Sequence, residues 1–245
     1  MPEQHDCNST DNLCRRGFLG AAFAIGATAL GGALSQVAHA DALTKERRDK
    51  KTSQEILEQM MKGNKRFASG RRRDHNYLAQ QRSSASGQYP VAVLLSCIDS
   101  RAPAETIMDM RIGDIFNTRM AGNISNPDVL GGMEFACKLS GAKVILVMGH
   151  TACGAVKGAI DNAELGNLTG LLAKIKPAVP ATAYSGERSS KNAAFVDAVA
   201  RKNVELTLAG IRKESPVLAA MESSGAIKIA GAMYSLETGL IDFFA

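Results

Sequence analysis

The fold of this chain is decided by residues 143–158, which read K-V-I-L-V-M-G-H-T-A-C-G-A-V-K-G. Val144–Met148 is a short apolar run rich in β-branched residues, a pattern typical of a strand buried on both faces. Gly149 is expected to end the strand, and the small residues that follow favour a helix. His150 and Cys153 therefore lie between a buried strand and a helix, at the sheet edge where ligands bind in α/β folds.

A second buried-strand pattern upstream leads into another group of polar side chains. Val91–Ser96 is apolar up to its last residue, and C-I-D-S-R follows at 97–101. If the two strands are parallel neighbours, Cys97 comes close to His150 and Cys153. Two thiolates and one imidazole supply three zinc ligands and leave one tetrahedral position open for water. The alternative is a disulfide between the two cysteines, which would leave the histidine and the aspartate without a role.

An aspartate and an arginine follow the first cysteine at intervals of two residues. Asp99 can point to the same side of the strand end as Cys97. There it would accept a hydrogen bond from an attacking hydroxide and aim the oxygen lone pair at a substrate carbon. Arg101 can hold the carboxylate of Asp99 through a bidentate pair and keep it away from the metal. The alternative is an ordinary surface salt bridge.

Strand and helix patterns alternate along the rest of the chain and predict one α/β domain, a mainly parallel sheet flanked by helices. Strands are expected at residues 91–96, 115–119, 143–148, 226–234 and, at an edge, 239–244. Helices are expected at residues 53–67 with Ser53 as N-cap, 103–110, 130–139, 168–175, 192–213 and 216–223. Cys137 has no partner spaced for metal binding and is interpreted as a core residue. Residues 41–52 are expected to be mobile, residues 70–87 to be a surface loop with room for one helical turn, and residues 177–191 to be a loop.

The paired motif resembles the zinc signature of the β-class carbonic anhydrases, in which C-x-D-S-R precedes H-x-x-C-G by about 50 residues. The resemblance runs from Leu57 to the C-terminus. It implies reversible hydration of carbon dioxide to bicarbonate and a proton, with Zn²⁺ held by Cys97, His150 and Cys153. It also implies that Asp99 can replace water as the fourth zinc ligand in a closed, inactive state.

The same resemblance implies a set of residues that line the substrate pocket. Gln88 matches a glutamine that donates a hydrogen bond to bicarbonate, Phe116 an aromatic lining residue, and Ala121 a small apolar one. Phe135 stands where plant-type members carry a tyrosine, so a hydroxyl is lost. The backbone N–H of Gly154 would face a substrate oxygen. Both phenylalanines could instead be core residues. Members regulated by a second bicarbonate carry tryptophan in place of the glutamine, so the resemblance favours the non-regulated, open type.

Oligomerisation is expected on the same ground, because in relatives both subunits line the pocket. The resemblance implies a homodimer or homotetramer. Residues 41–70 would form an N-terminal arm, in which Gly63, Asn64 and Phe67 match the segment that lies across the partner subunit. The alternative is a helix that packs on its own domain. His75 is a candidate proton shuttle, on the expectation that it is exposed.

The first 40 residues are interpreted as a signal peptide, and residues 41–245 as the carbonic anhydrase domain. Cys14–Leu19 resembles the twin-arginine export motif, Ala21–Leu34 is a small-residue apolar core, and Ala38–Ala40 supplies a cleavage site. The protein would be exported folded to the periplasm, with no stable membrane anchor after cleavage. An uncleaved anchor is the alternative.

Amino-acid composition and the spacing of residues around Cys97 argue against two other functions. Net charge is +5, but only 5% of residues are aromatic, which argues against nucleic-acid binding. A cysteine phosphatase would need arginine six residues after the cysteine, where this chain has Pro103. Two alternatives stay open: a CS2 or COS hydrolase on the same fold, and a non-catalytic zinc-binding protein of the periplasm. Such binding proteins usually carry His-rich tracts, whereas this chain has four His.

Overall fold

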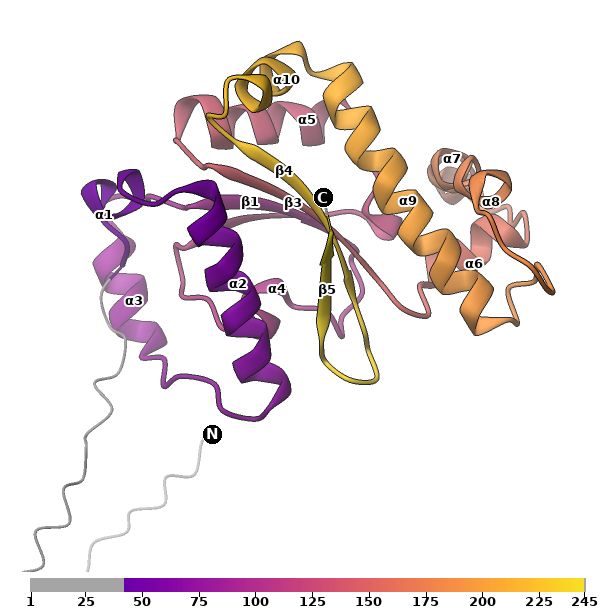
Figure 1. The fold of residues 1–245 in the computed structure, drawn as a ribbon, viewed down its shortest axis with the longest axis horizontal. Helices are drawn as coiled ribbons and strands as arrows, with labels where there is room; N and C mark the ends of the chain where they lie inside the picture. Colours follow the sequence, from indigo (N-terminus) through magenta and orange to yellow (C-terminus); the bar gives the residue numbers. More distant parts are fainter. Residues whose placement is uncertain (1–41, 245) are drawn as a thin grey trace, which may run out of the picture. The chain divides into compact units, whose positions relative to one another are not determined.

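The computed structural model describes residues 42–244, so the predicted signal peptide lies outside the described residues. Its sheet contains five strands: β1 Ala92–Ser96, β2 Ile115–Arg119, β3 Val144–His150, β4 Lys228–Tyr234 and β5 Ile241–Phe244. Their order is β2-β1-β3-β4-β5 (Figure 1). The first four strands are parallel, and β5 is antiparallel to β4. The mainly parallel sheet and its edge strand are therefore confirmed.

The strand order reverses between β1 and β3. From β1 the chain continues to β2 on one side, and β3 then leads to β4 on the other side. The carboxyl ends of β1 and β3 therefore flank a topological switch point, which is where open parallel sheets bind ligands.

Alternate side chains of the strands supply two hydrophobic clusters, one on each face of the sheet. Ala92 and Leu94 pack on one face, against α2 (Ser53–Ala68) and α4 (Ala104–Ile107). Val93 and Leu95 pack on the other face. That face is covered by α5 (Pro127–Glu134), the π-helical turn η2 (Phe135–Leu139), α9 (Ala193–Glu214) and α10 (Pro216–Ser223). The sheet is therefore a buried central layer.

A third cluster lies beyond the carboxyl edge of the sheet. The first half of α9 contributes Phe195, Val196 and Val199 to it, and Cys97 and Cys153 belong to it as well. The other elements are the 3₁₀ turn η1 (Ala121–Asn123), α6 (Gly154–Ile160), α7 (Gly166–Ile175) and α8 (Ala178–Ala181). In Figure 1, α9 extends past the sheet to reach α6 and α8. The polar edge of the sheet is thereby enclosed by apolar packing.

The prediction that Gly149 ends the third strand is wrong. Gly149 and His150 remain in β3 and pair with Met233 and Tyr234 of β4. A Cβ at position 149 would lie 2.8 Å from Val204 Cγ2 and 2.8 Å from Met233 Sδ. Glycine is thus needed where α9 approaches the backbone of the strand, rather than for a turn.

Several predicted helix boundaries differ from the structure. The helix predicted from residue 130 begins at Pro127, with Asn126 as the N-cap that accepts a hydrogen bond from the Val129 N–H. Proline at the first helical position is a recognised start signal. The helix predicted at 103–110 is only the single turn α4, and the loop predicted at 177–191 contains α8. The helix predicted at 168–175 begins at Gly166.

The N-terminal segment is more ordered than the sequence predicted. Residues 45–49, expected to be mobile, form α1 (Lys45–Asp49), in which Arg48 is buried and donates to the Ser140 carbonyl. The N-cap of α2 is Thr52 rather than Ser53, in a reciprocal capping box with Glu55. The loop predicted at 70–87 contains the helix α3 (Tyr77–Ser84).

Helix α2 packs on the sheet of its own chain, as the alternative interpretation had it. Its apolar face is buried in the first cluster. The Asn64 amide donates to the carbonyls of Ile107 at 3.0 Å and Gly239 at 2.8 Å, and its oxygen accepts from the Ile241 N–H at 2.8 Å. Asn64 itself is buried, and its hydrogen bonds to these three backbone groups fix α2 to the domain. Within residues 42–244, no helix has the length and apolarity needed to span a membrane.

Candidate metal centre

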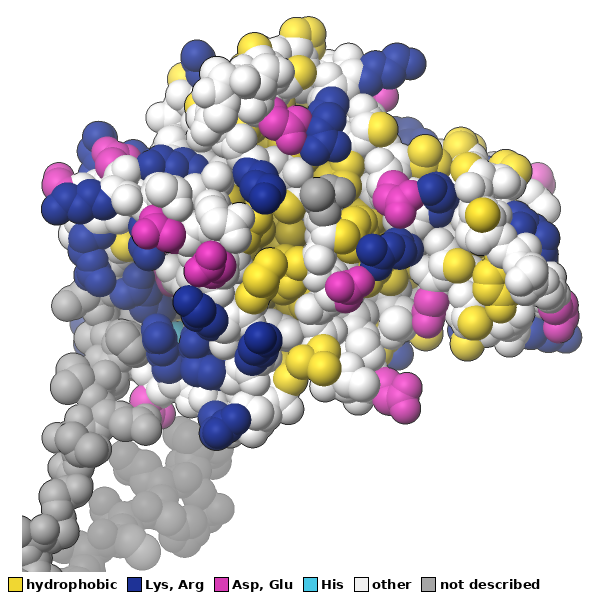
Figure 2. Space-filling model, viewed as in Figure 1, with side chains coloured by type: hydrophobic (Ala, Val, Ile, Leu, Met, Phe, Trp, Pro, Cys, Tyr) yellow, Lys and Arg dark blue, Asp and Glu magenta, His cyan; other side chains and the backbone are white. Residues whose placement is uncertain are grey.

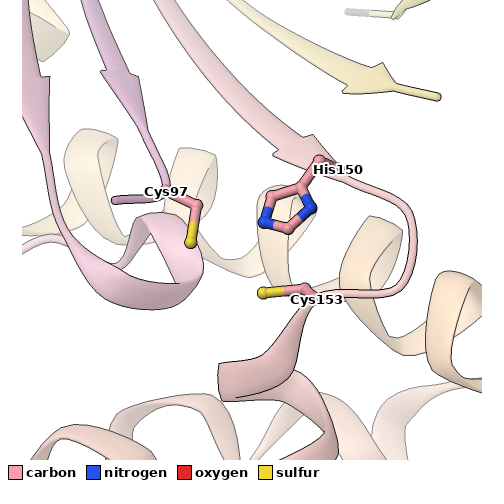
Figure 3. A group of neighbouring side chains, drawn as sticks. All are labelled: Cys97, His150 and Cys153. Atoms are coloured by element: carbon pink, nitrogen blue, oxygen red, sulfur yellow. The ribbon is translucent and has the colours of Figure 1, made fainter. Parts of the chain in front are cut away.

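Three side chains converge at the switch point between β1 and β3. Cys97 directly follows β1, His150 is the last residue of β3, and Cys153 is the N-cap of α6. Their ligand atoms all lie within 4.8 Å of one another, and Figure 3 shows both sulfurs and the imidazole directed to a common space. The residues are 5%, 2% and 1% exposed. The parallel register pairs Ser96 with Met148, which brings the two strand ends level.

The turn that carries His150 and Cys153 is held from two sides. Ala152 has a positive φ of 55°, and its N–H donates to Asp197 Oδ1 of α9 at 2.8 Å. The N–H of Thr151 donates to the Tyr234 carbonyl at 2.9 Å. A left-handed alanine is unfavourable by itself, so these contacts stabilise the turn that directs Cys153 back toward the histidine.

The hydrogen bonds of the imidazole determine which nitrogen faces the sulfurs. His150 Nδ1 lies 2.9 Å from the Thr151 carbonyl, an acceptor, so this nitrogen carries the proton and donates. His150 Nε2 is buried and has no hydrogen-bond partner within the described part of the chain. A buried nitrogen lone pair without a partner is costly unless a ligand occupies it, and a metal ion would do so.

The thiol of Cys97 is held in place by a backbone hydrogen bond. The N–H of Gly122, in η1, donates to Cys97 Sγ at 3.4 Å, and Gly122 adopts a positive φ of 68°. Asn203 of α9 donates to the carbonyl of that glycine at 2.6 Å. Sequence reasoning missed Gly122, Asn203 and Asp197. The sequence could have indicated Asn203, because it lies on the buried stripe of α9 between Val199 and Thr207. A polar residue on such a stripe needs a hydrogen-bond partner.

The two thiols influence each other strongly. The pKa of Cys97 is lowered from its usual value, because its thiolate accepts a hydrogen bond from the Cys153 thiol and is also near His150. Donating that hydrogen bond, together with burial, raises the pKa of Cys153. Burial acts to lower the pKa of His150, but the Cys97 thiolate raises it. The site therefore stabilises a cysteine thiolate beside the imidazole nitrogen of His150, and this pair of ligands suits a divalent cation.

Asp99 and Arg101 form the bidentate pair that the sequence suggested. Arg101 Nε donates to Asp99 Oδ1 at 2.9 Å, Nη2 donates to Oδ2 at 2.7 Å, and the backbone N–H donates to Oδ1 at 2.9 Å. These hydrogen bonds hold the pKa of Asp99 well below its usual range. Asp99 Oδ2 lies 3.8 Å from His150 Nε2, beside the centre. Arg119 Nε donates to the Cys97 carbonyl at 2.9 Å and thus supports the same loop.

The remaining predicted site residues fall into two groups. Ala121 and Gly154 are next to the centre, because Ala121 precedes the Gly122 amide and Gly154 begins α6. Gln88, Phe116 and Phe135 are not brought to it on the same chain. Gln88 is exposed ahead of β1, at the opposite edge of the sheet. Phe116 pairs with Val93 near the start of β2, and Phe135 is 51% exposed beside it, with ring centroids 6.2 Å apart.

Three further predictions can be compared with the structure. Cys97, Cys137 and Cys153 are all free thiols, so the disulfide alternative is wrong. Cys137 is 3% exposed in the core, which confirms its interpretation, and burial raises its pKa to about 12. The expectation that His75 is exposed is wrong: its side chain is 2% exposed, and Nε2 lies 2.8 Å from Asp109 Oδ1.

Comparison with known proteins yields one family. A family model described as carbonic anhydrase matches residues 92–241. The chain is 32% identical to carbonic anhydrase 2 of Mycobacterium tuberculosis over 186 residues, 74% of this chain and 87% of that protein. It is 33% identical to a carbonic anhydrase of Pseudomonas aeruginosa over 168 residues, 66% of this chain and 76% of that protein.

Solved structures agree with this result. A β-carbonic anhydrase of Aspergillus fumigatus aligns with a TM-score of 0.59 and 25% identity, over 78% of this chain and 89% of its own. A β-carbonic anhydrase of Sordaria macrospora, described as tetrameric, aligns with a TM-score of 0.57 and 26% identity, over 65% of this chain and 82% of its own.

Proposed function

The chain belongs to the carbonic anhydrase family, and on that premise we propose that it is a zinc-dependent β-class enzyme. The reaction is the reversible hydration of carbon dioxide to bicarbonate and a proton. One observation carries the proposal: Cys97, His150 and Cys153 meet in a buried group at the switch point, with their ligand atoms within 4.8 Å of one another. Asp99 lies beside this group in a pair with Arg101.

The residues present fit zinc. Two sulfurs and one imidazole nitrogen are ligands that zinc accepts in tetrahedral sites, and three protein ligands leave one position for water. The unpartnered Nε2 of His150 is the lone pair that such an ion would occupy, and the Thr151 carbonyl fixes the ring for it. When bound, zinc lowers the pKa of a coordinated water so that a hydroxide nucleophile is available near neutral pH.

Asp99 and Arg101 position the reaction. Because its pKa is well below its usual range, Asp99 is an ionised acceptor at any pH near neutrality. It would accept the hydrogen of the nucleophile and leave an oxygen lone pair directed at carbon dioxide. We propose the open arrangement, in which Asp99 does not bind the metal. Its support is that moving Asp99 to the metal would require giving up three hydrogen bonds to Arg101.

A second copy of the chain would complete the substrate pocket. Gln88, Phe116 and Phe135 lie away from the centre of their own chain, and the half-exposed ring of Phe135, beside Phe116, offers an apolar contact to a neighbouring subunit. Strand β2, which carries Phe116, is an edge strand. We therefore propose that these residues line the pocket of a neighbouring subunit in a homodimer or homotetramer. The tetrameric state of the Sordaria macrospora relative supports this arrangement.

We also propose that residues 1–40 direct folded export to the periplasm and are then removed. The support is the sequence alone, with Arg15 and Arg16 ahead of an apolar stretch and Ala38–Ala40 after it. Export after folding suits a centre with two thiols, since these stay reduced in the cytoplasm. The test is the mass of the periplasmic protein: cleavage leaves a chain that begins at Asp41, and replacing both arginines by lysine should abolish export.

Zinc content and carbon dioxide hydration, measured together on the purified protein, test the enzymatic proposal. The expected result is about one zinc per chain and rapid hydration in a stopped-flow assay. The control is CS2 as an alternative substrate in the same preparation. Consumption of CS2 without carbon dioxide hydration would refute the assignment, and a metal-free protein with oxidised cysteines would refute the site.

A further inference from the structure

A second polar site lies at the opposite edge of the sheet from the metal centre. It is a cavity of about 280 Å³, and Val91 and Asp114, which precede β1 and β2, belong to its wall. Five Lys or Arg side chains and two aspartates line it. We call it the amino-edge cavity. Nothing in the carbonic anhydrase reaction requires a cavity at this edge.

Both aspartates of the cavity already have cationic partners. Asp114 accepts from Arg111 Nε at 3.1 Å and from Nη2 at 2.9 Å. The side chain of Asp109 is fully buried, and it accepts from Arg66 Nε at 2.6 Å and lies 2.8 Å from His75 Nε2. The backbone N–H of Arg73 donates to it as well, at 3.3 Å. A carboxylate with this many donors has little capacity left to neutralise other cations.

Three cationic side chains of the cavity, those of Arg47, Lys51 and Arg73, form no ion pair within residues 42–244. Arg47 and Arg73 form no ion pair there, and Lys51 Nζ donates only to the neutral Gln59 Oε1, at 3.0 Å. Glu55 of α2 interacts electrostatically with Lys51, and Glu55 and Glu58 line a neighbouring pocket with Lys51 and Arg73, but both glutamates also have other partners. Glu55 belongs to the capping box with Thr52, and Glu58 pairs with Lys62 at 3.6 Å. Several like charges around one concavity create a positive potential that attracts anions.

The net positive charge of the described residues lies in the segment that supplies most of the cavity wall. Residues 42–84 contain 12 Lys or Arg and 5 Asp or Glu, whereas residues 85–244 contain 15 of each. Figure 2 shows Lys and Arg side chains gathered in one region, around the visible edge of a histidine. A plain solvated surface would spread such charge. Here Arg66 and Arg111 are fixed by their aspartates, so the cavity wall is organised before any ligand binds.

We propose that the amino-edge cavity binds a small phosphate-class oxyanion, free phosphate or a phosphate monoester. The planar guanidinium groups of Arg47 and Arg73 match such an oxyanion in bidentate geometry, and Lys51 adds a point charge. A doubly charged oxyanion gains more from three cations that form no ion pair than bicarbonate does, because the anion carries twice the charge. The bound anion would supply the negative charge that the two aspartates do not.

Isothermal titration of the zinc-loaded protein with inorganic phosphate tests this proposal. The test variant is Arg47→Gln with Arg73→Gln. The matched control is Lys191→Gln with Lys213→Gln, which removes two exposed cations that lie outside the cavity. Ionic strength is held constant with chloride, because surface charge effects are screened by salt. We expect saturable binding of one phosphate per chain and an affinity at least about tenfold weaker in the test variant. The control should bind as the unmodified protein does.

Two results would overturn the proposal: no saturable binding by the unmodified protein, or equal affinity in the test variant. Equal affinity would indicate that phosphate binds at the metal centre instead, because the two arginine substitutions leave that centre intact. Sedimentation with vesicles that contain phosphatidic acid, a lipid whose headgroup is a phosphate monoester, separates a lipid headgroup from a free phosphate as the source of the anion. Vesicle binding that free phosphate displaces, and that the test variant lacks, supports a lipid headgroup as the source. Vesicle binding without any binding of free phosphate refutes a small-oxyanion site.

Discussion

The two edges of one sheet carry opposite kinds of chemistry. At the carboxyl edge, two sulfurs and an imidazole lie in a buried group that suits a soft or borderline cation. At the amino edge, four arginines and one lysine line a cavity together with two aspartates that are paired with arginine. The two sites lie at opposite edges of the same parallel sheet, a cation site at one edge and an anion site at the other.

The two sites also differ in how they are held together. The ligands of the metal centre are adjacent to β1 and β3, so the strand register itself brings them close. The amino-edge cavity depends on Asp109, which follows α4 and connects to Arg66 of α2 and to His75. The comparison teaches that the sheet positions the residues of the metal centre, whereas helices packed onto the sheet position those of the amino-edge cavity. The variants below test that separation.

The largest effect is expected from His150→Ala. Removing one of three ligands should reduce bound zinc from about one per chain to almost none, and should lower carbon dioxide hydration by about 10³-fold or more. Metal analysis and stopped-flow hydration check this. Cys137→Ala is the control, because it removes a thiol of the core and should keep zinc. Phosphate binding at the amino edge should not change, and its loss would break the proposed independence of the two edges.

Asp99→Ala should separate metal binding from turnover. Zinc should remain, because the three ligands are untouched, while kcat/KM falls by about 10²-fold because the nucleophile loses its acceptor. Glu164→Ala, an exposed acidic residue, is the control. The measurement is the hydration rate per bound zinc. Full activity in the Asp99 variant would remove the proposed role of this carboxylate.

Asp109→Asn should weaken the amino edge and leave the metal centre loaded. Burial acts to raise the pKa of Asp109, but hydrogen bonds from His75, Arg66 and the Arg73 N–H lower it below the usual 3.8. Its contribution to stability is therefore present above 3.8 and is lost as pH falls through the lowered value. At about pH 7 the substitution should reduce the free energy of unfolding by about 2 kcal/mol.

Urea unfolding of both proteins at several pH values checks this prediction. The difference between them should shrink below the ordinary aspartate pKa, where the unmodified carboxylate also becomes protonated. Asp128→Asn, on an exposed position of α5, is the matched control. A difference that stays constant with pH would show that packing, rather than charge, stabilises this edge.

The smallest effect is expected from Asn203→Ala. This change removes the donor to the Gly122 carbonyl, and thereby loosens the amide that donates to Cys97 Sγ. Zinc transfer to a chelator should become about tenfold faster, as is typical when a second-sphere partner of a metal ligand is lost. Glu205→Ala on the same helix is the control. Unchanged zinc release would show that the glycine turn holds its position without the asparagine.

The sequence predicted the metal ligands well because their signal is local. A buried-strand pattern followed by Cys97, and another followed by His150 and Cys153, implied neighbouring strand ends in a parallel sheet. Boundaries were predicted less well where a tertiary contact decided them. Gly149 continues β3 because α9 packs against its backbone. Likewise α1 forms because Arg48 reaches the Ser140 carbonyl, which is 92 residues away in sequence.

The sequence alone determined that buried strands alternate with helices, which implies a parallel sheet, and it determined which three side chains could bind a metal. Both signals are local, because apolar periodicity and short residue spacing are properties of neighbouring residues. Tertiary structure decided the rest. It placed Gln88, Phe116 and Phe135 away from the centre of their own chain, and it joined Asn203 to Gly122. It also brought Arg66 and His75 of the basic N-terminal segment to Asp109. These outcomes depend on contacts between residues distant in sequence, and packing, rather than local pattern, selects such contacts.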